Sequence, residues 1–127
     1  MRTMRTPMAR ARGLGAAKDG TGHWWLQKLL SLALIPLVIW FAASVISLAG
    51  ADHATVTAWL GNPLAAGLMI LLVIATFYHG LFGVQAVVED YVDHEVAKFA
   101  LLIGLKGLHI VLGLTGVLAV LTILFQG

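Results

Sequence analysis

Two histidines lie deep inside long apolar stretches of the sequence. His79 lies in the apolar run 64–88, and His109 lies in the run 99–125. Because an ionisable side chain is costly to bury in a membrane, each is a candidate functional residue. Histidine is a common axial ligand of haem iron, but it also hydrogen-bonds between neighbouring helices. The residue alone leaves haem ligation and structural hydrogen bonding equally open for His79.

The two histidines lie at about the same depth. His79 precedes Val88 by nine residues and His109 follows Phe99 by ten, so at about 1.5 Å per residue each lies roughly 13 to 15 Å from its helix end. A haem held between them within one chain is therefore geometrically possible. Gly83 lies one turn after His79 on the same helical face and would provide the shallow wall that a flat macrocycle needs.

A polar and small-residue stripe follows one face of the third apolar run. Its members are Lys106, His109, Gly113 and Gly116. At this helical spacing the stripe should face the helix bundle or a partner rather than lipid. Lys106 could contact a haem propionate or extend its ammonium group towards the membrane surface, and we favour the second alternative.

An acid and a phenol follow the second apolar run directly. Asp90 and Tyr91 are preceded by Glu89, and Tyr91 lies about 18 Å along the helix axis from His79 at the usual rise. Tyrosine can donate a hydrogen bond to a quinone carbonyl while the acid accepts one or relays a proton. Tyrosine is also common at membrane interfaces, and that simpler interpretation is the stronger one on spacing alone.

Three apolar runs position these residues. They cover residues 29–48, 64–88 and 99–125, and each is long enough to cross a bilayer as a helix. Alternation typical of barrel strands is absent, so the sequence predicts an all-α membrane protein with three transmembrane helices. We expect residues 1–28 to form a basic N-terminal segment, residues 29–127 to form the anchor, and the polar residues 89–98 to form a short acidic loop.

Charge and composition set the orientation and the class. Residues 1–28 carry a net charge of +5, and the remaining residues carry −3. Because Lys and Arg stay on the cytoplasmic side, we expect a cytoplasmic N-terminus and a periplasmic C-terminus. With 60% hydrophobic and 11% charged residues and no cysteine, the chain is neither a water-soluble globule nor a nucleic-acid binder, and it cannot ligate an iron–sulfur cluster through thiolates.

Two stretches of the sequence carry specific motifs. One is His79-Gly-Leu-Phe-Gly-Val-Gln-Ala-Val-Val-Glu-Asp-Tyr-Val92, and the other is Arg12-Gly-Leu-Gly-Ala-Ala-Lys-Asp-Gly-Thr-Gly-His-Trp-Trp-Leu-Gln-Lys28. Together they cover about a quarter of the chain. They resemble a known family, the small hydrophobic anchor (D) subunits of alphaproteobacterial succinate dehydrogenase, or complex II. The first stretch has its histidine, glycine, glutamine and Asp-Tyr-Val at the family's separations, and the second is similar to the family's segment before the first helix.

The resemblance implies a role for each matching position. His79 would be an axial ligand of haem b, with the second ligand supplied by a cytochrome b-type membrane subunit. Tyr91 would hydrogen-bond ubiquinone, Asp90 would be its acidic neighbour, and Gly83 would be the small residue on the haem side. The partners implied are that membrane subunit, an iron–sulfur subunit and a flavoprotein subunit in the bacterial inner membrane. The chain itself would not contact succinate.

Two other functions stay open. In one, the chain is a self-contained small b-type cytochrome with His79 and His109 as paired ligands. In the other it is a structural anchor without a cofactor, and both histidines join helices.

Overall fold

The computed structural model describes residues 7–8 and 17–126, and four helices account for nearly all of that range. They are α2 (Ala17–Ser47), α3 (His53–Leu60), α4 (Pro63–Tyr91) and α5 (Glu95–Gln126). Arg2, Arg5, Arg10 and Arg12, which carry most of the predicted N-terminal charge, lie outside the described residues. The all-α prediction is confirmed.

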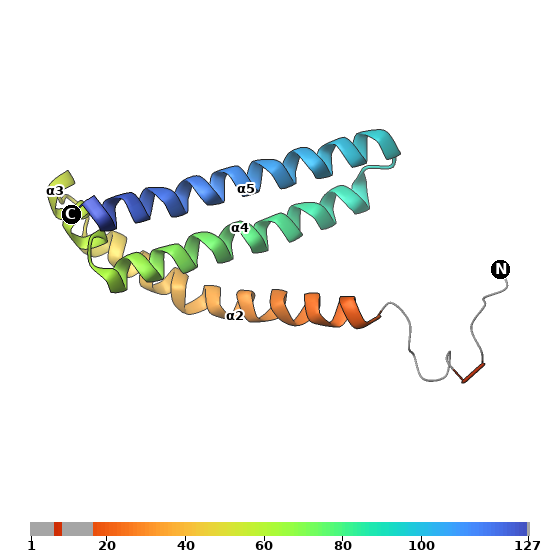
Figure 1. The fold of residues 1–127 in the computed structure, drawn as a ribbon, viewed down its shortest axis with the longest axis horizontal. Helices are drawn as coiled ribbons and strands as arrows, with labels where there is room; N and C mark the ends of the chain where they lie inside the picture. Colours follow the sequence, from red (N-terminus) through yellow and green to blue (C-terminus); the bar gives the residue numbers. More distant parts are fainter. Residues whose placement is uncertain (1–6, 9–16, 127) are drawn as a thin grey trace.

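Helix α4 is the centre of the fold. It packs against α5 along its length and against α2 on another side, whereas α2 and α5 do not meet in the described part of the chain. Figure 1 shows α4 running between its two neighbours, with the short α3 crossing the end of the bundle beside the C-terminus. A residue of α4 can therefore face α2 or α5.

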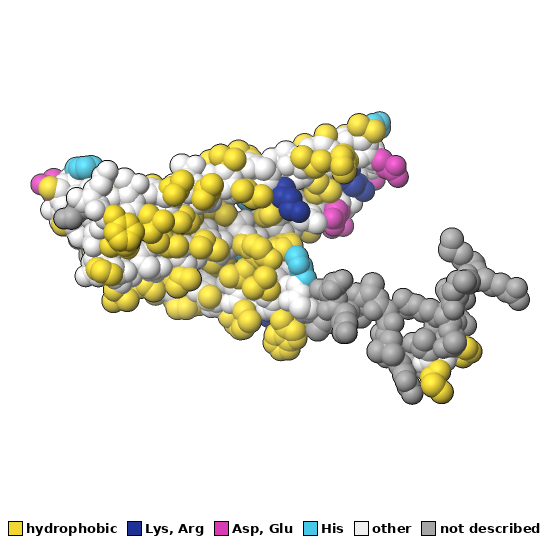
Figure 2. Space-filling model, viewed as in Figure 1, with side chains coloured by type: hydrophobic (Ala, Val, Ile, Leu, Met, Phe, Trp, Pro, Cys, Tyr) yellow, Lys and Arg dark blue, Asp and Glu magenta, His cyan; other side chains and the backbone are white. Residues whose placement is uncertain are grey.

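Three helices are long and apolar enough to cross a membrane, as predicted. The spans are Gly22–Ser47, Pro63–Tyr91 and Glu95–Gln126. Each is longer than the apolar run from which it was predicted, because a helix satisfies its own backbone hydrogen bonds and can continue into water beyond the hydrocarbon region. Large apolar side chains cover most of the visible face of the bundle, with acidic groups at its two ends (Figure 2).

The predicted acidic loop at 89–98 is wrong in extent. Helix α4 continues to Tyr91 and α5 begins at Glu95, so only residues 92–94 lie between them. The amide Nε2 of Gln85 donates to Oε1 of Glu89 one turn later, at 3.1 Å, and this pair supports the last turns of α4. The acids of this segment are therefore carried mainly on helix ends.

The connector between the first two spans contains a helix that the sequence analysis did not predict. Asp52 caps α3, since its Oδ1 accepts the backbone N–H of Thr55 at 2.8 Å. Hydrogen bonding from Thr55 lowers the pKa of the Asp52 carboxyl below its usual value. Gly50 has a φ of +80°, which closes the turn before this cap at little steric cost.

Small residues bring α4 and α5 together. A Cβ placed on Gly113 would lie 3.5 Å from Cβ of Phe77, and one on Gly116 would lie 3.1 Å from Cγ1 of Val73. This confirms that the glycines of the predicted stripe face the bundle, where they allow close helix packing. The helix pair is thereby held in one register along the half of α5 that follows His109.

Candidate functional site

His79 faces α2. Its Nδ1 lies 3.2 Å from Oγ of Ser31, and that hydroxyl donates its proton to the backbone carbonyl of Gln27 at 2.9 Å. The His79 side chain is otherwise exposed on the surface of the isolated chain. With Nδ1 occupied by the hydroxyl, Nε2 is the ring nitrogen left for an external ligand.

His109 faces α4 and is half-buried. Its Nδ1 lies 2.8 Å from the carbonyl oxygen of Leu105 in its own helix, which makes Nδ1 the protonated nitrogen. Its Nε2 would lie 3.7 Å from a Cβ built on Gly80, so the imidazole lies against the backbone of α4. The ring of Phe77 meets it edge to face, with 6.1 Å between ring centroids.

The structure therefore does not place the rings of His79 and His109 on opposite sides of one shared ligand site. His79 contacts α2, whereas His109 fills the contact between α4 and α5. A shared haem iron would need both Nε2 atoms to point at a common centre. Their present neighbours place the two rings on different sides of α4, with His79 towards α2 and His109 towards α5.

Gly83 lies in open space. A Cβ added to it would meet nothing within 4 Å in the described part of the chain, one turn from His79. The helix surface is therefore open at this position, one turn from His79.

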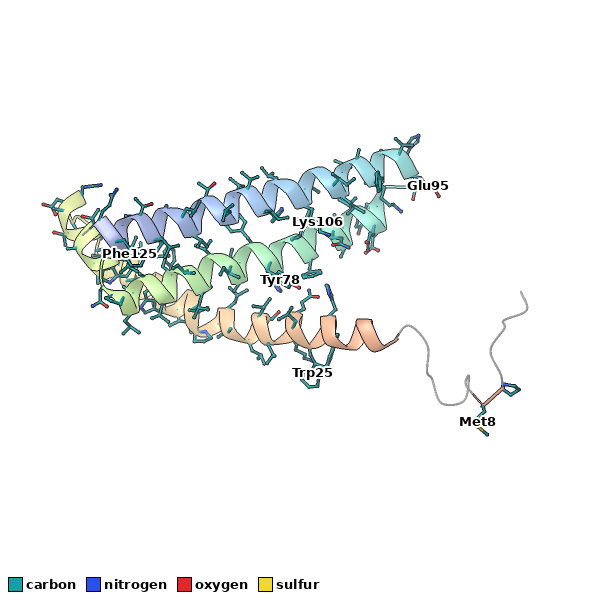
Figure 3. The ribbon with its side chains drawn as sticks, in the orientation of Figure 1. Met8, Trp25, Tyr78, Glu95, Lys106 and Phe125 are labelled. Atoms are coloured by element: carbon teal, nitrogen blue, oxygen red, sulfur yellow. The ribbon has the colours of Figure 1, made fainter. Side chains whose placement is uncertain are left out.

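Lys106 lines a groove of about 210 Å³ between α4 and α5. Gln85, Leu81 and Phe99 are among the other lining residues. Figure 3 shows Lys106 on α5 and Tyr78 on α4. The Lys106 side chain is exposed, so its ammonium group is free to extend along the groove.

Asp90 and Tyr91 form the last turn of α4. Both are exposed, and 81% of the Tyr91 surface is accessible. The first turns of the α2 span lie at the same end of the bundle, since the His23 ring meets Phe82 edge to face at 4.2 Å. A phenol and a carboxylate are thus presented together at the end of the bundle that also carries the start of α2.

Two aromatic residues and one basic residue at the start of the α2 span form a local cluster. Nζ of Lys28 lies 4.4 Å from the ring centroid of Trp24, and Trp25 packs edge to face on Trp24 at 5.0 Å. Both tryptophans are about half exposed. This arrangement is typical of an aromatic belt with a basic anchor at a membrane surface.

Sequence reasoning missed Ser31 and His23. A hydroxyl inside an apolar run was the available signal for Ser31, but its neighbour on another helix depends on how the helices rotate against each other. The aromatic contact of His23 with Phe82 likewise joins α2 to α4, and no spacing within one helix predicts it.

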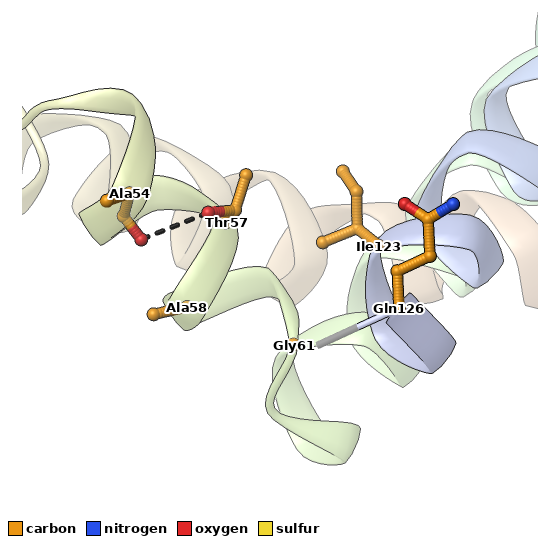
Figure 4. Close-up of a pocket in the computed structure, with 6 residues that line it drawn as sticks. All are labelled: Ala54, Thr57, Ala58, Gly61, Ile123 and Gln126. Atoms are coloured by element: carbon orange, nitrogen blue, oxygen red, sulfur yellow. Dashed lines mark hydrogen bonds between the residues drawn. The ribbon is translucent and has the colours of Figure 1, made fainter.

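Another hollow lies away from His79 and His109. It has a volume of about 610 Å³ between α3 and the end of α5, and Figure 4 shows its lining. The lining residues are Ala54, Thr57, Ala58, Gly61, Ile123 and Gln126, and none of them is ionisable. The hydroxyl of Thr57 is already used, since it donates to the carbonyl of Ala54 at 3.0 Å. This hollow therefore offers no acid, base or metal ligand.

The residues around His79 fit a haem better than a bare metal ion. Within residues 7–8 and 17–126, no three His, Asp or Glu side chains gather as a metal ion would require. A haem iron needs only one protein ligand on each face, since the macrocycle supplies the other four. An exposed imidazole with an occupied Nδ1 and a bare glycine one turn away meets that need.

Comparison with known proteins agrees with the fold and with the sequence motifs. Residues 2–122 match the family model described as succinate dehydrogenase/fumarate reductase transmembrane subunit. The chain is 27% identical over 123 residues to a succinate dehydrogenase hydrophobic membrane anchor subunit of Rickettsia bellii. The aligned residues cover 97% of this chain and 96% of the relative.

A further relative is the succinate dehydrogenase hydrophobic membrane anchor subunit of Paracoccus denitrificans. It is 31% identical over 97 residues, covering 76% of this chain and 75% of the relative. No solved structure matches the chain significantly. The three spans and these bacterial relatives place the chain in the bacterial inner membrane as a multi-pass protein. The chain belongs to the succinate dehydrogenase and fumarate reductase transmembrane subunit family, as one of its hydrophobic membrane anchors.

Proposed function

We propose that this chain anchors a succinate:ubiquinone oxidoreductase in the membrane, supplies one axial ligand to haem b and forms part of the ubiquinone site. The observation that carries the haem assignment is the exposed His79 imidazole, whose Nδ1 is hydrogen-bonded and whose Nε2 is free. The second axial ligand would come from a cytochrome b-type membrane subunit, because the other membrane histidine of this chain lies against Gly80.

A bound haem b would supply one-electron redox chemistry. The chain's own contribution is to present and orient the imidazole of His79. Gly83 leaves room beside His79 for the flat group. Lys106 is proposed to extend its ammonium group towards the membrane surface, with a contact to an acidic edge of the group as the competing role.

The ubiquinone site would use the end of α4. Tyr91 is exposed and free to donate its phenolic proton to a quinone carbonyl, and Asp90 beside it can accept or pass on a proton. An accessible pair at the membrane surface suits a substrate that enters from the bilayer. Reduction of a quinone to a quinol takes up two electrons and two protons, so a proton relay is needed at this place.

The partners follow from the missing chemistry. The sequence contains no cysteine, so iron–sulfur chemistry would reside in an iron–sulfur subunit. Flavin chemistry would reside in a flavoprotein subunit. With the N-terminus on the cytoplasmic side, three spans put Asp90 and Tyr91 on the cytoplasmic side too, where those subunits would dock. Oxidation of succinate would take place in the flavoprotein.

Purification of the tagged chain in mild detergent tests the proposal. We expect three further polypeptides, a covalent flavin and a haem b band in the reduced-minus-oxidised spectrum. A chain that purifies alone with a full haem complement would instead support the self-contained cytochrome. An intact complex without a haem band would support the structural anchor and contradict the haem assignment.

A further inference from the structure

Three atoms on two helices form a directional chain of hydrogen bonds that ends on His79. The Ser31 hydroxyl carries a single proton, and that proton goes to the carbonyl oxygen of Gln27 at 2.9 Å. With the proton placed there, the hydroxyl oxygen is left to accept from Nδ1 of His79, which lies 3.2 Å away. The chain therefore runs from imidazole N–H to hydroxyl to backbone carbonyl.

The direction of the hydrogen bond between His79 and Ser31 decides which tautomer the His79 imidazole adopts. A neutral imidazole carries its one N–H proton on either Nδ1 or Nε2. A proton held on Nδ1 therefore leaves the lone pair on Nε2. The same hydrogen bond restrains rotation of the ring, because the Oγ position is fixed by its own bond within α2. In metal sites a partner of this kind orients the ligand and raises its basicity.

The contact also joins two spans. Ser31 belongs to α2 and His79 to α4, so the plane of the imidazole depends on how α2 sits against α4. Ser44 provides an internal comparison on the same helix. Its hydroxyl donates to the carbonyl of Trp40 at 2.8 Å, the same bond one turn back, but it serves no histidine.

We propose that Ser31 is a positioning residue for the haem ligand: it holds the proton on Nδ1 of His79 and so presents Nε2 to the iron in a fixed plane. This inference rests on the proposed function, in which His79 ligates haem. Ser31 itself would not touch the haem.

The test compares Ser31→Ala with Ser44→Ala in the purified complex. Loss of the acceptor leaves the Nδ1 proton without a partner, so the imidazole becomes a weaker donor to ferric iron. We expect Ser31→Ala to bind haem on the order of 10-fold to 100-fold more weakly and to raise the haem midpoint potential. Ser44→Ala should leave both quantities unchanged.

A second pair of variants separates the effect of losing the Ser31 hydroxyl from the effect of changing the side-chain volume. Ser31→Thr keeps a hydroxyl and Ser31→Val replaces it with a methyl group of similar size, so the pair remains informative if Ser31→Ala does not assemble. Ser31→Thr should retain the wild-type potential, whereas Ser31→Val should behave like Ser31→Ala. In complexes with ¹⁵N-labelled histidine, the proton of the His79 ring should be on Nδ1.

The inference would be overturned if Ser31→Ala or Ser31→Val left haem affinity and potential at wild-type values. It would also be overturned by a His79 proton on Nε2. These results are distinct from failure of the proposed function, which would appear as retention of haem in His79→Leu.

Discussion

The imidazole of His109 lies against Gly80, the residue that directly follows His79 in α4. Its Nε2 would be 3.7 Å from a Cβ at that position, which is ordinary van der Waals contact. His109 therefore occupies the contact between α4 and α5 instead of facing an open surface. A haem bound by His109 would require this ring to leave its place, whereas a haem bound by His79 requires no change between α4 and α5.

Gly83 tests the haem-facing surface. We expect Gly83→Leu to reduce haem content at least 10-fold in the assembled complex, because the new side chain would fill the space beside His79. Gly67→Leu is the matched control, since it lies on the same helix and its Cβ also meets nothing within 4 Å. Haem measured by pyridine haemochrome should be normal in the control. Equal haem in both variants would argue against a haem beside Gly83.

Lys106→Met tests the placement of the charge. If the ammonium group lies near the haem edge, its removal disfavours the more negative reduced haem. The midpoint potential should then fall by about 60 mV, which is the equivalent of about 1.4 kcal/mol for unit charges about 12 Å apart at an effective dielectric of about 20. Lys98→Met, on the same helix nearer its start, should produce a smaller change. An unchanged potential in Lys106→Met would assign that side chain to the membrane surface.

Tyr91→Phe should lower kcat/KM for ubiquinone reduction by about tenfold, because one hydrogen bond to the quinone is lost. The haem spectrum should not change. Tyr78→Phe, which lies earlier on the same helix, is the matched control and should reduce quinone normally. Steady-state quinone reductase assays on membranes measure both. Wild-type kinetics in Tyr91→Phe would remove that phenol from the quinone site.

The main elements could be predicted from the sequence because each span is a long apolar run with its own hydrogen bonds. The runs 29–48, 64–88 and 99–125 correspond to the spans of α2, α4 and α5. The helix ends could not be placed as well, because Glu89 and the residues after it are polar yet remain helical. The helix α3 was missed because its eight residues are stabilised by the Asp52 cap and by contact with α4 and α5.

The depth of the site residues in the membrane was predictable, but the neighbouring helix that each side chain faces was not. Helical rise places His79 and His109 at similar depths, and this made an intrachain haem geometrically possible. Which neighbour each ring meets depends on the rotation of α4 between α2 and α5, and that rotation is set by contacts such as Gly116 with Val73. The partnership of His79 with Ser31 follows from the same packing and could not be read from spacing along one helix.

The Asp52 cap should make the α3 helix sensitive to acid. Hydrogen bonding from Thr55 lowers the folded-state pKa of this carboxyl below the ordinary value of 3.8. The stabilisation is therefore fully present above the unfolded-state pKa and is lost as the pH falls through the lower folded-state pKa. We expect severalfold faster amide hydrogen exchange in α3 below that pH, after correction for the intrinsic rate.

Two variants separate the charge from the cap. Asp52→Asn keeps an oxygen acceptor for Thr55, so α3 should stay protected with no acid dependence in this range, whereas Asp52→Ala should be less protected at every pH. Exchange measured by mass spectrometry on the α3 peptide distinguishes the three proteins. Identical profiles for all of them would show that the cap does not stabilise α3.

The haem spectrum of His79→Leu beside that of His109→Leu tests the central claim most directly. In complexes purified through a tag on this chain, His79→Leu should lose the low-spin reduced-minus-oxidised band, because its iron lacks one axial ligand. His109→Leu should keep that band at wild-type intensity. A low-spin haem band that survives in His79→Leu, or that is lost equally in both variants, would contradict the assignment of His79 as this chain's haem ligand.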